Sequence, residues 1–362
     1  MATPPTDDPE TIDVRPGEGL DLARLEPWLR ANLEGAEGPL MVRQFGGGHA
    51  NLTYLLRFGA REFVLRRPPY GTLAPSAHDM AREHRVLARL WRAYPLAPQS
   101  FVHATDTSII GAEFHVLDRR HGFVIRGEAS RVLDDPAIAA RVGAMLVDCL
   151  ADFHSVRPDD VGLGDLGRPE GFMARQIEGW TRRWAAARDD AAPDADALIR
   201  WLGAGRPPTR SHTLVHNDYK LDNVLVAGDD PGRAVAVLDW DMCTRGDPLS
   251  DVGTLLNYWN DLRDPEDWKT ATSMRSDRPG FPRRREAVER YVARTGFDGT
   301  SMTWYWAFAT FRTAVILQQI YIRWLRGETR DERFASFGDR VRALMRKAEA
   351  IAEAAVPQAR LP

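Results

Sequence analysis

The stretch "LVHNDYKLDNVLV", from Leu214 to Val226, places a cluster of polar side chains between two apolar flanks of β-strand character. Strands with such flanks are normally buried, and buried polar groups need hydrogen-bond partners or a functional reason to be there. The polar cluster runs from His216 to Asn223 and holds histidine, aspartate, lysine and asparagine. The stretch therefore predicts a rigid platform of short strands that holds a chemically active loop.

The residues after Asn223 predict a β-hairpin. "VLVA" and "AVAVL" are β-rich runs, and "GDDPG" between them is a strong turn signal. Because the ends of a hairpin lie roughly 5 Å apart, we expect Asn223 and Asp239 to meet at its open end. An amide oxygen beside a carboxylate forms a hard, oxygen-only site, which suits Mg²⁺.

Asp218 lies in the loop that leads into this hairpin, five residues before Asn223. There it could take the proton of an attacking hydroxyl, while Lys220 could contact a transferred phosphate. A base, a cation and a metal clamp are what phosphoryl transfer requires. Simpler interpretations are an Asx turn at Asp218, a solvated Lys220 and a structural His216.

The rest of the chain divides into a β-rich part and a helical part. Strands are expected near Leu40–Phe45, Leu52–Phe58 and Glu62–Arg66, followed by an amphipathic helix with Ser76 as its N-cap and two more strands in "FVHATD" and "EFHVLDR". From about Pro136 the pattern is helical. We predict an α+β fold with a flexible tail (1–18), a small antiparallel-sheet lobe with one packed helix (19–120) and a larger, mainly helical lobe (121–362).

Composition narrows the classes of function. The chain has 362 residues, 44% hydrophobic, with a formal net charge of −3, so no basic excess points to nucleic acid. The most apolar segment, Trp304–Ile322, contains Arg312 and predicts a buried helix rather than a membrane span, with its aromatic residues in the core or along an acceptor pocket. With only Cys149 and Cys243 and no signal peptide, a cytoplasmic location is expected.

Two motifs resemble those of a known family. "HNDYKLDN" resembles the kinase catalytic loop H-x-D-x-x-x-x-N, and "LDWD" resembles its metal-binding D-F-G segment. Together with "GDPLSD", they are most similar to the aminoglycoside phosphotransferase and choline kinase-like family, which has a bilobal, protein-kinase-like fold. "QFGGGHANLTYLL…REFVLRRPP" further resembles the branch associated with acyl-CoA dehydrogenases.

The resemblance implies a role for each matching residue. Asp218 would orient or deprotonate the acceptor hydroxyl, Asn223 and Asp239 would hold Mg²⁺, and the hinge at Leu117–His121, including Leu117 and Asp118, would receive the adenine of ATP. The residues implied to cover or contact the ATP phosphates are Gly46, Gly47, Gly48, His49, Asn51, Arg66 and Glu83, with Glu83 pairing with the cation on the strand.

The nucleotide side has one departure from the family pattern, and two alternatives stay open there. The sequence has only three lysines, none before Lys220, so Arg66 occupies the place of the usual strand lysine. Gly46–Gly48 lacks the full G-x-G-x-x-G pattern and could be a plain hairpin turn. Glu83 lies on an arginine-rich helix and could form a surface pair instead. Asp247 and Asp251 are expected to be scaffolding, with Asp251 capping the next helix.

The leading hypothesis is an ATP- and Mg²⁺-dependent kinase acting on a hydroxyl of a small molecule, by resemblance a hydroxyacyl-CoA or hydroxy acid. Alternatives are an aminoglycoside or choline-like amino-alcohol phosphotransferase, for which "NDLRDPEDW" (Asn260–Trp268) is the one acidic candidate, and a non-catalytic kinase-like nucleotide-binding module. A P-loop NTPase is excluded, because no lysine follows a glycine.

Overall fold

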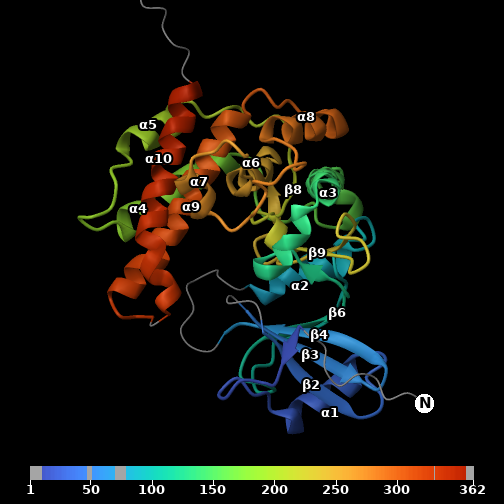
Figure 1. Ribbon diagram of the computed structural model, residues 1–362. Coiled ribbons are helices and arrows are strands. Elements are labelled where there is room, and N and C mark those ends of the chain that lie inside the picture. The colour runs from blue at the N-terminus through green and yellow to red at the C-terminus, as the bar shows by residue number, and fades with distance from the viewer. Residues whose placement is uncertain (1–9, 47–50, 70–78, 330, 356–362) are drawn as a thin grey trace, which may run out of the picture. The chain divides into compact units, whose positions relative to one another are not determined.

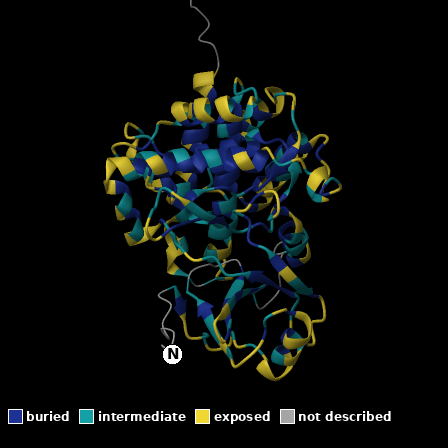
Figure 2. Cartoon of the chain, turned by 90° about the vertical axis from the view of Figure 1, so that its right-hand side faces the viewer, coloured by how far each residue is buried: buried dark blue, intermediate teal, exposed yellow. Residues whose placement is uncertain are grey.

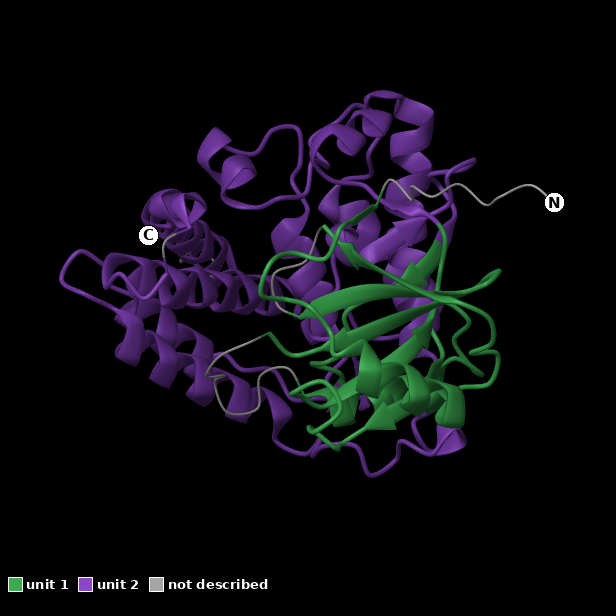
Figure 3. Cartoon of the chain, turned by 90° about the horizontal axis from the view of Figure 1, so that it is seen from below, with its two compact units in different colours: residues 1–121, 235–243 green, residues 122–234, 244–362 purple. Residues whose placement is uncertain are grey.

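The computed structural model describes residues 10–46, 51–69, 79–329 and 331–355. The chain forms two compact units, residues 1–121 with 235–243 and residues 122–234 with 244–362 (Figure 3). The first is called the N-unit below and the second the C-unit. In each of them buried residues gather in the interior and exposed ones on the outside (Figure 2).

The N-unit is built on a six-stranded sheet with the strand order β1-β2-β3-β4-β6-β5 (Figure 1). The pairs β2–β3, β3–β4 and β4–β6 are all antiparallel, and Leu65 on β4 is opposite Val116 on β6. Its strands and helices are β1 (Thr11–Ile12), α1 (Leu22–Asn32), β2 (Leu40–Phe45), β3 (Leu52–Phe58), β4 (Arg61–Arg67), α2 (Met80–Leu90), β5 (Ser100–Ala104) and β6 (Phe114–Asp118).

One helix of the N-unit begins later than the sequence suggested. The predicted N-cap, Ser76, lies outside the described residues, and α2 begins at Met80 with Asp79 as its N-cap. The Asp79 carboxylate accepts a hydrogen bond from the Arg82 backbone N–H at 2.8 Å. Aspartate caps a helix as well as serine does, so residue type alone does not decide between Ser76 and Asp79.

The C-unit is mainly helical and has two small antiparallel strand pairs, β7 with β9 and β8 with β11. Strand β10 (Ala234–Val237) begins at the boundary between the units. The elements of the C-unit are β7 (Phe123–Val124), α3 (Pro136–His154), α4 (Phe172–Ala187), α5 (Asp196–Ala204), β8 (Thr213–Val215), β9 (Val224–Val226), β11 (Thr244–Gly246), α6 (Leu249–Tyr258), α7 (Glu266–Ala271), α8 (Arg284–Thr295), α9 (Met302–Leu325) and α10 (Phe337–Ala355), with short 3₁₀ turns at Gly127–Asp134, Asp159–Val161, Leu221–Asn223 and Glu332–Ser336.

Helix α9 is the centre of the C-unit and packs against α4, α6 and α10. Its segment from Met302 to Val315 is almost wholly buried, as the apolar run predicted. Gly253 on α6 permits the close approach of α6 to α9, because a Cβ at this position would meet the Tyr305 backbone oxygen at 2.5 Å. None of the described helices, α9 included, combines the length and apolarity of a membrane span.

Candidate functional site

The loop after β8 carries the predicted catalytic residues and is fixed through its backbone. Asn217 adopts a left-handed conformation, with φ at 66°. The backbone N–H groups of His216 and Asn217 donate to the two carboxylate oxygens of Asp251, at 2.6 and 2.7 Å. Left-handed backbone is uncommon outside glycine and persists where the surroundings enforce it. Asp251 supplies that enforcement from the first turn of α6.

Asp251 was expected to cap its own helix, and this expectation is wrong. It lies inside α6 and is fully buried, and its carboxylate oxygens accept hydrogen bonds from the catalytic loop. His154 Nε2 also lies 3.2 Å from Asp251 Oδ2, and His154 Nδ1 lies 2.6 Å from the Tyr291 hydroxyl. Burial alone would raise the pKa of Asp251, but the bonds from His154 and the His216 N–H hold its pKa below the ordinary value.

Three of the predicted residues meet on this loop. Lys220 Nζ lies 2.6 Å from Asp218 Oδ2. The Asn223 side-chain amide donates to Asp218 Oδ2 at 3.0 Å and to the Asp218 carbonyl at 2.8 Å. All three side chains are half-buried. The pKa of Lys220 is raised despite its burial, because Tyr258 and Asp218 favour the ammonium form. The half-buried carboxylate of Asp218 is thus aimed by one cation and one amide.

Side chains from segments distant in the sequence lie near this trio, and the sequence analysis did not assign them to the site. Arg312 of α9 donates to the Asn217 carbonyl, and Lys220 Nζ lies 5.3 Å from the centre of the Tyr258 ring. Ser273 donates to Asp222 at 2.6 Å. Their spacing in sequence carries no signal, although an arginine in the apolar run of α9 was an anomaly that a search could have used.

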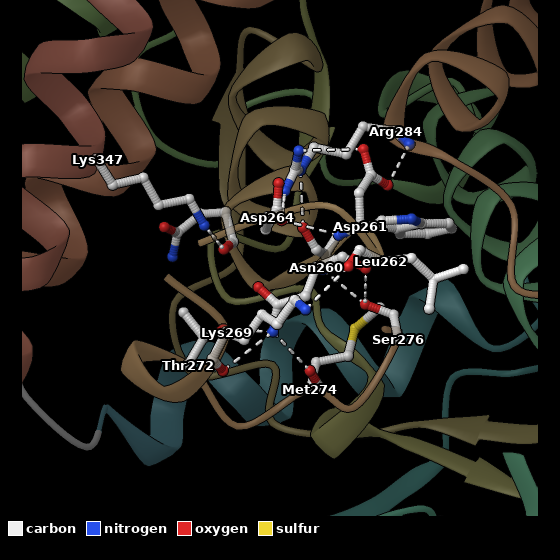
Figure 4. Close-up of polar contacts among 12 residues, drawn as sticks. Asn260, Asp261, Leu262, Asp264, Lys269, Thr272, Met274, Ser276, Arg284 and Lys347 are labelled. Carbon is white, nitrogen blue, oxygen red and sulfur yellow. Dashed lines mark hydrogen bonds and ion pairs between the residues drawn. The ribbon is translucent and has the colours of Figure 1, made fainter. Parts of the chain in front are cut away.

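The loop that carries Ser273 is held by Asn260 (Figure 4). The Asn260 amide donates to the carbonyls of Lys269 and Met274, at 3.2 and 3.0 Å. Its backbone N–H donates to Ser276 Oγ at 2.6 Å. Asn260 is buried, so these bonds are shielded from water. The acidic run that begins at Asn260 is therefore partly a structural clamp.

The nucleotide-side residues of the N-unit gather around Arg66. Its Nη1 lies 2.7 Å from Glu83 Oε1, and its Nη2 donates to Asp239 Oδ1 at 2.9 Å. Glu83 is fully buried, so it does not form the surface helix pair that the sequence left open. Asp239, like Asn217, has a left-handed backbone, with φ at 69°. The Trp240 N–H donates to Glu83 at 3.4 Å, which ties the "LDWD" segment to α2.

Glu83 is held from its other side by a chain of hydrogen bonds. His115 Nε2 lies 3.2 Å from Glu83 Oε2, and Ser100 Oγ bridges the Nδ1 atoms of His115 and His84 at 3.1 and 2.8 Å. Burial would raise the pKa of Glu83, but Arg66 and His115 keep its pKa below the ordinary value. Glu83 is therefore a carboxylate, which is what a partner of Arg66 has to be.

The remaining predicted residues that the structure describes lie at strand ends. Gly46 directly follows β2, and Asn51 is buried just before β3. Gly47, Gly48 and His49 lie outside the described residues. Leu117 and Asp118 end β6, where the Asp118 carboxylate accepts the Gln99 N–H at 2.7 Å and burial raises the pKa of Asp118.

The predicted site residues are thus divided between the units. The C-unit holds Asp218, Lys220 and Asn223, and the N-unit holds Arg66, Glu83 and Asp239. The predicted pairing of Asn223 with Asp239 spans both units and stays a prediction. Within the described ranges, no group of three or more His, Cys, Asp or Glu side chains is arranged to hold a metal ion.

Comparison with known proteins identifies the family. Residues 41–294 match the model of the Phosphotransferase enzyme family. That match covers more than half of the chain, and the chain belongs to this family. The resemblance to the aminoglycoside phosphotransferase group is thereby confirmed.

Curated relatives come from the predicted branch. Acyl-CoA dehydrogenase family member 11 of Rattus norvegicus is 32% identical over 336 residues, which cover 89% of this chain and 42% of that protein. Acyl-CoA dehydrogenase family member 10 of Mus musculus is also 32% identical, over 88% of this chain and 30% of its own length. The chain spans less than half the length of these relatives.

Solved structures share the fold. A candidate aminoglycoside phosphotransferase from Ralstonia eutropha is 29% identical, with a TM-score of 0.79, over 93% of this chain and 99% of that chain. Aminoglycoside phosphotransferase APH(4)-Ia is 17% identical, with a TM-score of 0.58, over 92% of this chain and 99% of that chain. The predicted bilobal, kinase-like α+β fold is confirmed.

Proposed function

We propose that this protein transfers the terminal phosphoryl group of ATP to a hydroxyl group of a small molecule, with Asp218 as the base. The observation that carries the proposal is the arrangement at Asp218. In a member of the Phosphotransferase enzyme family, its carboxylate is aimed by Lys220 and Asn223 on a loop locked by Asp251. A carboxylate held this way can accept the acceptor's proton as the hydroxyl attacks phosphorus.

Lys220 has a second task in this scheme. Its ammonium pairs with the Asp218 carboxylate in the resting site, which holds that carboxylate in place. The same ammonium can compensate negative charge that develops on the transferred group. Arg66 would contact the ATP phosphates from the N-unit, where Glu83 and Asp239 fix its guanidinium.

The donor atoms fit Mg²⁺. Asn223 directs its amide nitrogen to Asp218, which leaves its oxygen available to a hard cation, and Asp239 is a carboxylate with 30% of its side chain exposed. These two residues would hold the ion, which when bound supplies positive charge to the phosphates. Support for ATP comes from APH(4)-Ia, whose structures contain ADP or AMP-PNP together with hygromycin B.

A hydroxy acid, or its CoA thioester, is the proposed acceptor. The names of the curated relatives place similar chains within acyl-CoA dehydrogenase family proteins. An amino-alcohol acceptor is the second candidate, by analogy with hygromycin B in APH(4)-Ia. We propose a cytoplasmic location, in keeping with two buried free cysteines.

Asp218→Asn tests the base assignment. The variant keeps the size and the hydrogen bond to Asn223 but cannot accept the proton, so acceptor-dependent ADP release should fall by about 10² to 10⁴-fold. Asp229→Asn, at an exposed turn, is the matched control and should keep the full rate. Mg-ATP should raise the melting temperature of both variants. An unchanged rate in Asp218→Asn would show that the base has been assigned wrongly.

A further inference from the structure

Two arginines of the C-unit carry charge in sheltered places without a carboxylate partner. Arg312 on α9 is 6% exposed, donates only to the Asn217 carbonyl, and lies 5.5 Å from the centre of the Trp180 ring. Arg340 on α10 is half-buried, donates to the Ala271 carbonyl at 3.0 Å and lies over Phe337. Neither forms an ion pair with any described carboxylate, although most arginines of the C-unit do. Burial lowers the pKa of both.

Sheltering a guanidinium without a counter-ion costs free energy, so Arg312 and Arg340 call for an explanation. Arg312 offers five N–H donors, and its bond to Asn217 uses one nitrogen. A structural role in holding one carbonyl would be served by a neutral side chain. A guanidinium with most of its N–H donors unused is suited to binding an anionic group of a ligand.

Both arginines are bound to segments that contact the catalytic loop. Arg312 donates to the Asn217 carbonyl, and Arg340 donates to the Ala271 carbonyl, two residues before the Ser273 whose hydroxyl donates to Asp222. The half-buried Tyr258 interacts electrostatically with Arg312, with Arg340 and with Lys220, which come from three separate elements. Burial raises the pKa of Tyr258 above its ordinary value, so at neutral pH its hydroxyl is a neutral donor. Tyr258 also lies close to the proposed base, because Lys220 Nζ contacts both the Tyr258 ring and the Asp218 carboxylate.

Nearby carboxylates do not cancel these cations. Asp218 is bound by Lys220, and Asp251 is committed to the His216 and Asn217 N–H groups. Asp222 accepts the Ser273 hydroxyl at 2.6 Å. Arg312 therefore remains beside the catalytic loop without an ion-pair partner in the described part of the chain.

Three of the four carboxylates in the acidic run that could have served a cationic acceptor are already ion-paired. Arg284 pairs with both Asp261 and Asp264 (Figure 4), and Asp267 pairs with Arg346 at 2.8 Å. An ammonium-bearing acceptor would thus meet two guanidiniums without ion-pair partners, while Glu266 is the one carboxylate of this run that forms no ion pair among the described residues, so its binding is disfavoured.

We infer that Arg312, Arg340 and the Tyr258 hydroxyl form an acceptor subsite that binds an anionic group while the acceptor's hydroxyl reaches Asp218. The inference rests on the proposed function and deepens it, because it selects an acidic acceptor over an amino alcohol. The recognised group is a carboxylate or a phosphate, since the guanidinium fork matches both. A free hydroxy acid offers the first, and its CoA thioester offers the second.

Arg340→Met is the primary test, because Arg340 is half-buried and methionine keeps the contact with Phe337. The kinetics are measured with a hydroxy acid, its CoA thioester, its uncharged methyl ester and an amino alcohol of equal length. We expect KM to rise about 10- to 100-fold for the anionic acceptor, the loss of one charge-assisted contact, with KM for ATP unchanged. KM for the methyl ester should not move.

Two further variants separate recognition from folding. Arg312→Lys keeps the charge and the reach to the Asn217 carbonyl but loses the fork, so it should raise the same KM while the protein stays folded by circular dichroism. Arg342→Met removes an exposed arginine of α10 that pairs with Asp339 and should behave as wild type. A rise confined to the free acid identifies a carboxylate site, and one confined to the thioester identifies a phosphate site.

Binding measurements keep this inference separate from the proposed function. Calorimetric titration of the acceptors in the presence of a non-hydrolysable ATP analogue requires no turnover. If wild type binds the acidic acceptor and Arg340→Met weakens binding, the subsite stands even if no phosphorylation occurs. If wild type phosphorylates only the amino alcohol, the kinase stands and the subsite is wrong. Equal binding of all acceptors by wild type and Arg340→Met also overturns it.

Discussion

Asp251 acts on the catalytic loop without contacting any reactant. We predict that Asp251→Asn destabilises the protein by roughly 2 to 4 kcal/mol, since an amide nitrogen would then face the N–H groups of His216 and Asn217. The free energy of unfolding in urea measures this. Asp298→Asn, at an exposed turn where Asp298 accepts the Thr300 N–H, is the control and should cost much less.

The same residue gives a pH dependence with a definite sign. Because the pKa of Asp251 is lower in the folded state than the unfolded value of about 3.9, its contribution is complete well above pH 4 and is lost as the pH falls through the folded pKa. The stability difference between wild type and Asp251→Asn should therefore shrink in acid. A difference that stays constant from pH 7 to pH 3 would contradict the assignment.

Asn217 shows how a single backbone angle restricts side-chain choice. Its φ of 66° is nearly free for glycine, tolerable for asparagine and costly for alanine. We predict that Asn217→Gly is neutral or stabilising by up to about 1 kcal/mol, and that Asn217→Ala destabilises by about 1 to 2 kcal/mol. Thermal unfolding of both variants checks the order, and equal effects would argue against backbone strain.

At the level of elements, α10 carries a lysine into the interior of the C-unit. Lys347 is fully buried, and its ammonium donates to the Asn257 carbonyl at 2.9 Å. The rings of Trp268 and Trp306 lie 5.7 and 5.9 Å away. Burial, with Arg284 as the second cause, lowers the pKa of Lys347 to about 7. Charging this amine therefore works against the packing of α10 on the rest of the unit.

The consequence is that stability should rise with pH. Between about pH 7 and the unfolded pKa of about 10.4, the unfolded chain binds the proton more tightly than the folded one, so wild type gains up to roughly 4 kcal/mol over this range. Lys347→Met removes the effect and should be more stable than wild type near pH 7, with the gap closing by pH 10. Urea unfolding at several pH values measures this stability difference, with Lys269→Met as a matched control.

Elements with strong periodicity were predicted well, and those set by tertiary contacts were not. Strands β2 and β3 match the expected ranges because alternation and the following turns fix both ends. The N-cap of α2 was wrong because Ser76 and Asp79 are equally capable. The capping role given to Asp251 was wrong because residue type shows only what a side chain can bind, and the loop that Asp251 actually binds is 34 residues away.

At the scale of the whole molecule, a segment from the second half of the chain belongs to the N-unit. Residues 235–243 belong with residues 1–121, and within them Trp240 is 1% exposed and packs against Tyr94. We predict that a fragment of residues 10–121 alone unfolds at a lower temperature than the same fragment joined to residues 235–243 by a flexible linker. Circular dichroism melting measures the difference in melting temperature between the two fragments. Trp240→Ala in the joined segment should abolish most of that difference.

The candidate site was predictable only where it is local in sequence. Asp218, Lys220 and Asn223 lie within six residues of each other, and the structure brings them together. Tyr258 could not be found, because the packing of α6 rather than any sequence spacing places it there, and Arg312 was visible only as a charged residue in an apolar run. The acceptor side of such a site depends on tertiary structure, which no motif encodes.

The scarcity of lysine, with three in the whole chain, turns amine acylation into a site-resolved reporter. Lys269 is partly exposed and should be modified first. Lys220 is bound to Asp218, so its labelling should respond to whatever occupies the catalytic loop. Lys347 is buried and should label only when α10 opens. One mass spectrum of the labelled chain would thus monitor surface, site and core separately.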